Sequence, residues 1–219
     1  MIEQKNTLLL LDGEEPSATL LSLFASRSQF NIATDGAART AKKNNIPLDV
    51  IIGDLDSLDN KTREHYSNSI IIELEDQYSN DFEKALRHLM TLKNTALLMI
   101  LGLHGKRVDH TLTNLSVLTR FRNEFENVIC IDDFQSHYLL TELHPFMKID
   151  APKNSLVSLT TLPLAATVIS EGLKYPLNGG SMTFGMQDGL SNVVNSDSGA
   201  TIRISSGHLL VSIEHHGAL

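Results

Sequence analysis

The pattern of apolar positions changes about two thirds of the way along the chain. Up to about residue 135, short continuous apolar runs alternate with segments that have helical periodicity. The apolar runs cover residues 7–11, 30–33, 50–52, 70–74, 96–101 and 128–131. Continuous runs are typical of strands covered on both faces, and strands that alternate with helices predict a mostly parallel α/β sheet.

Two of the segments between these runs have a clear helical pattern. In residues 80–90, NDFEKALRHLM, apolar side chains recur at spacings of three and four. We expect Asn80 to cap this helix with Glu83 as its capping-box partner, which places Asp81 in the first turn. In residues 108–121, the same spacing places four side chains on one apolar face. They are Val108, Leu112, Leu115 and Leu118.

Helical periodicity fades after about residue 135. The apolar runs there are short and separated by Gly, Pro, Asn and Ser, as in residues 172–192, GLKYPLNGGSMTFGMQDGLSN. This pattern is typical of an all-β, sandwich-like fold. The sequence therefore predicts an α/β domain in residues 1–138, followed by a small β-sandwich domain in residues 139–219.

Composition excludes several classes of protein. The formal net charge of −8 disfavours nucleic-acid binding. No apolar run approaches the ~20 residues that span a bilayer, and the N-terminal run at residues 8–11 is too short for a secretion signal. The single cysteine, Cys130, excludes an internal disulfide and a cysteine-based zinc site. We therefore expect a cytoplasmic protein that binds neither nucleic acid nor membrane.

Carboxylates follow the predicted strands, most clearly in DVIIGDLDSL, residues 49–58. The set comprises Asp35, Asp54, Asp56, Asp76, Asp81 and Asp109. Any one of them alone fits an ordinary turn or cap. The carboxyl ends of parallel strands meet at one edge of a sheet, where several carboxylates repel unless a hard cation binds them. Asp54 and Asp56 therefore predict a Mg²⁺ site.

Residues 101–110, LGLHGKRVDH, predict a phosphate-binding segment. Gly102 and Gly105 let the backbone approach a ligand closely, while Lys106 and Arg107 supply positive charge. The segment is not a P-loop, because G-x-x-x-x-G-K-[ST] occurs nowhere in the chain. The alternative is an ordinary strand-to-helix turn with a solvated basic pair.

These segments together resemble the bacterial type of the thiamine pyrophosphokinase family. ATDGAA, IIGDLDSL, DQYSNDFEKAL and GLHGKRVDHTLTNLSVL occur in the order of the family's motifs, and residues 172–192 with the closing GHLLVSIE resemble its β-domain. The resemblance implies transfer of the pyrophosphoryl group of MgATP to the hydroxyl of thiamine, which gives thiamine diphosphate and AMP. It also implies a homodimer with active sites at the subunit interface.

The same resemblance implies a role for each matching residue. The Mg²⁺ ligands would be Asp54, Asp56 and Asp81. The ATP site would comprise Asp35, Gly36, Gly102, Gly105, Lys106 and Arg107. The thiamine site would comprise Gln77, Asp81, Ser191 and Asn192. The catalytic residues would be Arg107, Asp81 and Asp109, and either carboxylate could orient or deprotonate the thiamine hydroxyl.

The chain departs from the family pattern in three respects. Lys106 stands where a second glycine is usual, and Asn80 stands where Thr or Ser is usual. The chain has no tryptophan, so the side chain that stacks on thiamine stays open.

Three other functions remain alternatives. A pyrophosphokinase could act on another hydroxymethyl acceptor, such as a pterin alcohol, and thiamine binding would distinguish the two. A nucleotide-sugar transferase with a D-x-D motif would turn over UDP-sugars. The three additional motifs of the chain disfavour this alternative, because such an enzyme does not require them. A non-catalytic nucleotide or thiamine sensor has less need of so many metal-binding carboxylates.

Overall fold

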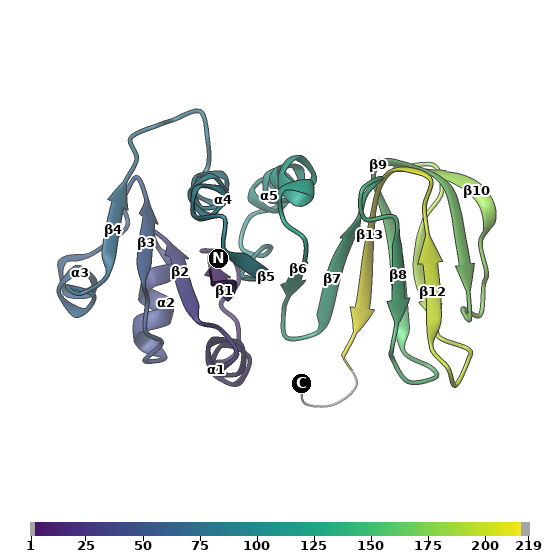
Figure 1. The fold of residues 1–219 in the computed structure, drawn as a ribbon, viewed down its shortest axis with the longest axis horizontal. Helices are drawn as coiled ribbons and strands as arrows, with labels where there is room; N and C mark the ends of the chain where they lie inside the picture. Colours follow the sequence, from purple (N-terminus) through teal and green to yellow (C-terminus); the bar gives the residue numbers. More distant parts are fainter. Residues whose placement is uncertain (1–2, 216–219) are drawn as a thin grey trace. The chain divides into compact units, whose positions relative to one another are not determined.

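The computed structural model describes residues 3–215 and divides into two compact units, which meet in sequence between Asp133 and Phe134. The first unit, up to Asp133, combines helices with parallel strands, and the second unit, from Phe134 onward, is built from antiparallel strands (Figure 1). The expected mixed α/β class is therefore confirmed.

The described part of the first unit forms a parallel sheet with the strand order β4-β3-β2-β1-β5-β6. The strands are β1 (Lys5–Leu10), β2 (Phe30–Thr34), β3 (Val50–Gly53), β4 (Ile70–Glu73), β5 (Thr95–Leu101) and β6 (Val128–Ile131). Each coincides with a predicted apolar run to within two residues. The order of the strands reverses between β1 and β5, and such a reversal is where open α/β sheets bind ligands.

Helices cover both faces of this sheet (Figure 1). They are α1 (Ala18–Ser26), α2 (Ala37–Lys43), α3 (Asn60–His65), α4 (Asp81–Leu92), α5 (Val108–Phe121) and the short 3₁₀ helix η1 (Arg122–Glu124). Leu8 and Leu10 of β1 share a core with α1, α2 and the residues that flank α3. Leu9, which is also buried, points to the opposite face, because successive side chains of a strand alternate.

Asn80 fixes the point at which α4 begins. Its Oδ1 accepts a hydrogen bond from the Glu83 N–H at 2.9 Å, so the predicted cap is confirmed. The reciprocal half of the predicted capping box is not made. The Glu83 carboxylate instead accepts hydrogen bonds from Arg87 and Arg120, and these charge-assisted contacts hold it away from the Asn80 backbone. Asp81 is therefore the first residue of α4.

Two predicted apolar faces are less covered than their patterns indicate. On α5, Leu118 is buried, but Val108 is 76% exposed and Leu112 is 58% exposed. Strand β4 lies at the edge of the sheet, where it pairs only with β3, and Ile70 is exposed. Periodicity correctly identified these elements as a helix and a strand, but the prediction that β4 is covered on both faces was wrong.

Strand β9 organises the second unit, because it pairs with β10, β11, β12 and β13. The strands are β7 (Gln135–Leu140), β8 (Phe146–Ile149), β9 (Leu156–Glu171), β10 (Asn178–Thr183), β11 (Gly189–Val193), β12 (Ala200–Arg203) and β13 (Ser206–Glu214). These strands pair with one another in antiparallel orientation. Their buried side chains, such as Val157, Leu159 and Leu209, form a core of their own. The arrangement as a sandwich of two sheets stays a prediction.

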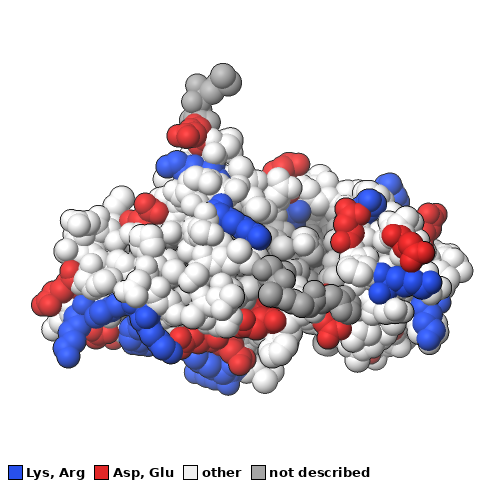
Figure 2. Space-filling view, turned by 90° about the horizontal axis from the view of Figure 1, so that it is seen from below, with Lys and Arg blue, Asp and Glu red and all other residues white. Residues whose placement is uncertain are grey.

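Basic and acidic side chains are interspersed on the face shown in Figure 2. The net charge of −8 is therefore not collected into a single acidic patch on that face. Within residues 3–215, none of the helices combines the length and the apolar composition that a bilayer crossing requires.

Candidate active site

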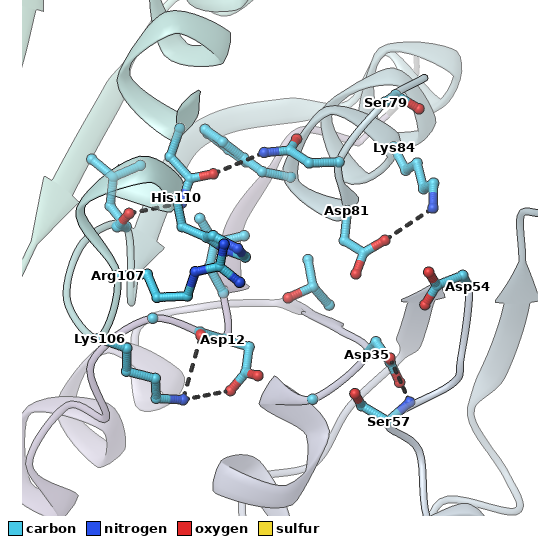
Figure 3. Close-up of a pocket in the computed structure, with 18 of the residues that line it drawn as sticks. Asp12, Asp35, Asp54, Ser57, Ser79, Asp81, Lys84, Lys106, Arg107 and His110 are labelled. Atoms are coloured by element: carbon cyan, nitrogen blue, oxygen red, sulfur yellow. Dashed lines mark hydrogen bonds and ion pairs between the residues drawn. The ribbon is translucent and has the colours of Figure 1, made fainter. Parts of the chain in front are cut away.

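A pocket of about 430 Å³ lies at the carboxyl ends of strands β1, β2, β3 and β5, and the loop between β4 and α4 completes it (Figure 3). All of its lining residues belong to the first unit. Most of the residues predicted for the first-unit part of the site line this pocket. They are Asp35, Gly36, Asp54, Asp56, Gln77, Asp81, Gly105, Lys106 and Arg107. Gly102 and Asp109 are not part of the lining.

Three carboxylates converge on one side of the pocket. Asp35, Asp54 and Asp81 each contribute an oxygen atom, and these oxygens lie within 4.8 Å of one another. Gly53, the last residue of β3, makes this approach possible. A Cβ atom at Gly53 would lie 2.9 Å from the Cβ of Asp35 and 3.2 Å from Oδ2 of Asp81, closer than side chains normally pack.

The surroundings of Asp35 fit a bound cation. The side chain is buried, and its Oδ2 accepts a hydrogen bond from the Ser57 N–H at 2.9 Å. Its Oδ1 is also buried and has no hydrogen-bond partner among the described residues. Burial is the main cause that raises the pKa of Asp35 to about 6; the neighbouring Asp81 carboxylate adds to this rise and the Ser57 N–H opposes it. A buried, unpartnered carboxylate oxygen beside two other carboxylates is a donor set that suits Mg²⁺.

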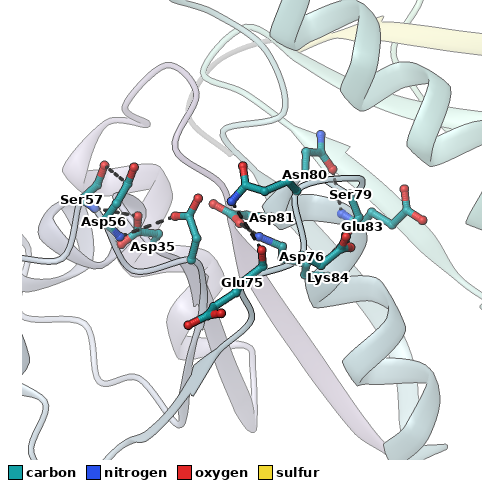
Figure 4. Close-up of polar contacts among 12 residues, drawn as sticks. Asp35, Asp56, Ser57, Glu75, Asp76, Ser79, Asn80, Asp81, Glu83 and Lys84 are labelled. Atoms are coloured by element: carbon teal, nitrogen blue, oxygen red, sulfur yellow. Dashed lines mark hydrogen bonds and ion pairs between the residues drawn. The ribbon is translucent and has the colours of Figure 1, made fainter.

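Asp56 occupies a different position from the one its spacing suggests. It is exposed at the rim of the pocket, where Oδ1 accepts a hydrogen bond from the Ser57 hydroxyl at 3.0 Å (Figure 4). Between Asp54 and Asp56, the buried Leu55 has φ = 61°, so the chain changes direction within the D-x-D motif. The converging set of three contains Asp35 and not Asp56, although Asp56 lies close enough to Asp35 to raise its pKa. The role predicted for Asp56 as a ligand stays a prediction.

Lys84 is a site residue that the sequence reasoning missed. Its Nζ lies 3.1 Å from Oδ1 of Asp81, and its side chain is 4% exposed, against 31% for Asp81. Burial raises the pKa of Asp81, while the hydrogen bond from Lys84 opposes that rise. Residues three apart share a helix face, so the spacing from Asp81 to Lys84 was an available signal.

The loop between β5 and α5 forms the basic side of the pocket. Gly102 has φ = 74°, and a Cβ atom there would lie 2.2 Å from the Leu11 carbonyl oxygen, so only glycine fits. Lys106 has φ = 50°, an unusual conformation for a residue with a side chain. Its Nζ lies 2.9 Å from Oδ1 of Asp12, a carboxylate after β1 that the sequence analysis did not single out.

Arg107 and Asp109 pair with each other. The Arg107 Nε donates to Oδ1 of Asp109 at 3.0 Å, and a second hydrogen bond joins the guanidinium to Oδ2. This contact lowers the pKa of Asp109 and raises that of Arg107. Both side chains are largely exposed, so the pair is open to exchange with a ligand.

The residues predicted to bind thiamine lie in both units. Gln77 lines the pocket of the first unit. In the second unit, Ser191 is exposed and its N–H donates to the Ser158 hydroxyl at 3.0 Å. Asn192 is buried, and its side-chain amide binds both backbone polar groups of Tyr175, at 3.1 and 2.7 Å. The position of Asn192 therefore suits holding Tyr175 in place.

Two family models match separate parts of the chain. The model for the thiamin pyrophosphokinase catalytic domain matches residues 21–130, which include every residue of the converging carboxylate set. The model for the thiamin pyrophosphokinase vitamin B1 binding domain matches residues 147–209.

Curated relatives with the same family name are similar to this chain in sequence. Thiamine pyrophosphokinase 1 of Oryza sativa subsp. japonica is 31% identical over 176 residues, which cover 74% of this chain and 64% of the rice protein. The match thus spans slightly less than two thirds of that relative. Thiamine pyrophosphokinase 1 of Arabidopsis thaliana is 32% identical over 196 residues, which cover 80% of this chain and 72% of the Arabidopsis protein.

The structure of thiamin pyrophosphokinase from Candida albicans superposes with a TM-score of 0.82 at 19% identity, and covers 97% of this chain and 90% of that one. This likeness shows a shared fold. The family models and the relatives carry the assignment further, and together they show that the chain belongs to the thiamine pyrophosphokinase family.

Proposed function

We propose that this chain transfers the pyrophosphoryl group of MgATP to the hydroxyl of thiamine, which yields thiamine diphosphate and AMP. The observation that carries the proposal is the pocket at the strand ends, where three converging carboxylates and the basic loop with Lys106 and Arg107 line one cavity. A site that binds a polyphosphate needs positively charged side chains and also ligands for a metal ion. The family assignment supports thiamine and ATP as the substrates.

Asp35, Asp54 and Asp81 are the proposed ligands of Mg²⁺, with Asp56 at the rim as a further candidate. The bound ion would neutralise charge on the phosphate oxygens. The unpartnered Oδ1 of Asp35 supports this assignment, because a buried carboxylate oxygen rarely lacks a partner.

The proposed ATP site comprises Asp35, Gly36, Gly102, Gly105, Lys106 and Arg107. Lys106 and Arg107 are held by Asp12 and Asp109 in exposed ion pairs. Water screens exposed ion pairs, so they contribute little and phosphate oxygens can readily replace the carboxylates. Gly102 would act indirectly, because it shapes the turn and does not line the pocket.

Asp81 is the better candidate for orienting or deprotonating the thiamine hydroxyl. It lines the pocket and burial raises its pKa, whereas Asp109 lies outside the lining and Arg107 lowers its pKa. A carboxylate with a raised pKa is the better proton acceptor. Most of the acceleration would come from positioning the hydroxyl in line with the reacting phosphorus atom.

We further propose a homodimer in the cytoplasm, with residues 1–138 as the catalytic domain, residues 139–219 as the thiamine-binding β-sandwich domain, and active sites at the subunit interface. The second unit exposes several large apolar side chains: Tyr175, Phe184, Met186 and Leu190. Phe184 and Met186 lie in the segment between β10 and β11, and Leu190 lies in β11. Exposed apolar side chains of this size are common on binding surfaces. Ser191 is the better candidate for direct contact with thiamine, and Asn192 would act through Tyr175.

The deciding experiment combines the protein with MgATP and thiamine and separates the nucleotides by chromatography. We expect AMP and thiamine diphosphate in equal amounts. ADP with thiamine monophosphate would contradict pyrophosphoryl transfer. AMP release with a hydroxymethyl pterin but not with thiamine would identify the other acceptor class, and thiamine binding without turnover would indicate a sensor.

A further inference from the structure

Lys84 is a buried cation on the acidic side of the pocket, with more hydrogen-bond donors than the protein uses. Its side chain is 4% exposed, and its amine points toward Asp81 in the pocket (Figure 3). An ammonium group has three donors. Within residues 3–215, the only hydrogen-bond partner of the Lys84 amine is Oδ1 of Asp81, at 3.1 Å.

Asp81 divides its two oxygens between different neighbours. Oδ1 accepts the hydrogen bond from Lys84. Oδ2 is turned toward the end of β3, where it would lie 3.2 Å from a Cβ atom at Gly53. Oδ2 is therefore the oxygen that faces the region of Asp35 and Asp54. A cation bound to Oδ2 would therefore be separated from the Lys84 amine only by the carboxylate group of Asp81.

We propose that Lys84 binds an oxygen of the pyrophosphoryl group of the nucleotide, an inference that rests on the proposed function. Mg²⁺ keeps part of its coordination for substrate phosphate oxygens, so a phosphate on this cation lies beside Asp81. Lysine binds phosphate as a point charge and needs no fixed planar geometry. The unused donors of Lys84 supply that charge from the acidic side, opposite Lys106 and Arg107.

A purely supporting role would make Lys84 a counter-ion that orients Asp81. The two roles predict different effects on ligand binding when the Lys84 amine is removed. Loss of a phosphate contact weakens the binding of pyrophosphate and leaves Mg²⁺ binding intact. Loss of a supporting contact disturbs Asp81 and thereby weakens Mg²⁺ binding itself.

The test compares Lys84→Met and Lys84→Gln with the control Lys61→Met, which changes an exposed lysine of α3 outside the pocket. Thermal unfolding is measured with Mg²⁺ alone, and then at saturating Mg²⁺ with increasing inorganic pyrophosphate. We expect both Lys84 variants to keep the full shift in Tm with Mg²⁺ alone, because Lys84 binds Oδ1 of Asp81 whereas Oδ2 faces the other two carboxylates. Their apparent affinity for pyrophosphate should fall about tenfold or more. Lys61→Met should match the wild type.

Three results would overturn the inference. The first is unchanged affinity for pyrophosphate in a folded Lys84 variant, and the second is a wild type that does not respond to pyrophosphate. The third is a parallel loss of the Mg²⁺ response, which would assign Lys84 to the support of Asp81. Lys84→Gln retains a hydrogen-bond donor for Asp81, so the titration can be done with this variant if Lys84→Met does not fold. The pyrophosphate titration needs no thiamine. A negative result in it would refute the role of Lys84, whereas a wild type that releases no AMP with thiamine would refute the proposed function.

Discussion

Asn80 and Asn114 join the two sides of the pocket through their side-chain amides. The Asn80 Nδ2 donates to Oδ1 of Asn114 at 2.9 Å, and the Asn114 Nδ2 donates to the Leu103 carbonyl oxygen at 2.8 Å. Asn80 caps the helix that begins at Asp81, while Leu103 lies in the loop that carries Lys106. These two bonds therefore couple the carboxylate side to the basic loop.

Replacement of Asn114 by alanine should loosen that coupling. We expect Asn114→Ala to lower the free energy of unfolding by about 1–2 kcal/mol, because it leaves partly buried polar groups without partners. The kcat/KM for ATP should fall by about tenfold as the two sides lose their fixed separation. Asn127→Ala is the matched control, since Asn127 also donates to a backbone carbonyl but lies outside the pocket. Equal effects of the two variants on kcat/KM would refute the coupling.

Asp35 and Asp56 provide a direct comparison between the structural and the sequence-based assignment of the metal site. We expect Asp35→Asn to abolish the stabilisation by Mg²⁺ in thermal unfolding and to lower kcat by about 10²-fold or more. Asp56→Asn should have a smaller effect on both, because Asp56 lies at the exposed rim. If Asp56→Asn proves the more damaging substitution, the cation is held by the set that the sequence alone predicted.

Glu83 should make stability depend on acid pH. Burial alone would raise the pKa of Glu83, but hydrogen bonds from Arg120 and Arg87 lower it on balance. A lowered pKa in the folded state gives stability that is present above the pKa of the unfolded state and is lost as the pH falls through the folded value. Glu83→Gln should therefore be less stable than the wild type by about 1–2 kcal/mol at pH 7.

The difference between wild type and Glu83→Gln should shrink as the pH falls below about 4, which urea unfolding at a series of pH values would measure. Glu64→Gln, on the exposed surface of α3, controls for the loss of one negative charge. If the free energies of unfolding of the wild type and Glu83→Gln differ as much at pH 3 as at pH 7, the ionised Glu83 carboxylate is not the cause of the difference.

Mixed dimers test the proposed interface site. Asp54→Asn removes a proposed metal ligand in the first unit, and Ser191→Arg places a bulky charge at the exposed Ser191 of the second unit. Each variant alone should be inactive. After the two are unfolded and refolded together, half of the dimers should be mixed, with one intact site each, so about a quarter of wild-type activity should return. No recovery, with subunit exchange confirmed by mass, would place each site within one chain.

The sequence predicted the strands and the edge of the sheet that carries the pocket, because apolar runs and helix caps are local signals. Asn80 and Asp81 lie where their pattern places them. The exposed Val108 shows the limit of periodicity, which tells which side chains share a face but not what covers that face.

Other site features depend on contacts that spacing cannot show. The left-handed Leu55 turns Asp56 to the rim, while Gly53 admits Asp35, and both effects arise from the three-dimensional path of the chain. The spacing places Lys84 on the same helix face as Asp81, but it does not show that Lys84 is buried, which follows from the packing of α4 against β2 and β3. Asn192 has the pattern of a turn residue but is buried against Tyr175.

The two sides of the pocket come from successive parts of the chain. Strands β2, β3 and β4 lie on one side of β1, and Asp35, Asp54 and Asp81 all precede β5 in the chain. Chains fold from the N-terminus as they emerge, and several paired strands are needed for stability. All three carboxylates of the converging set therefore leave the ribosome before the basic loop does, so the two sides of the pocket differ in when they become available to the folding chain.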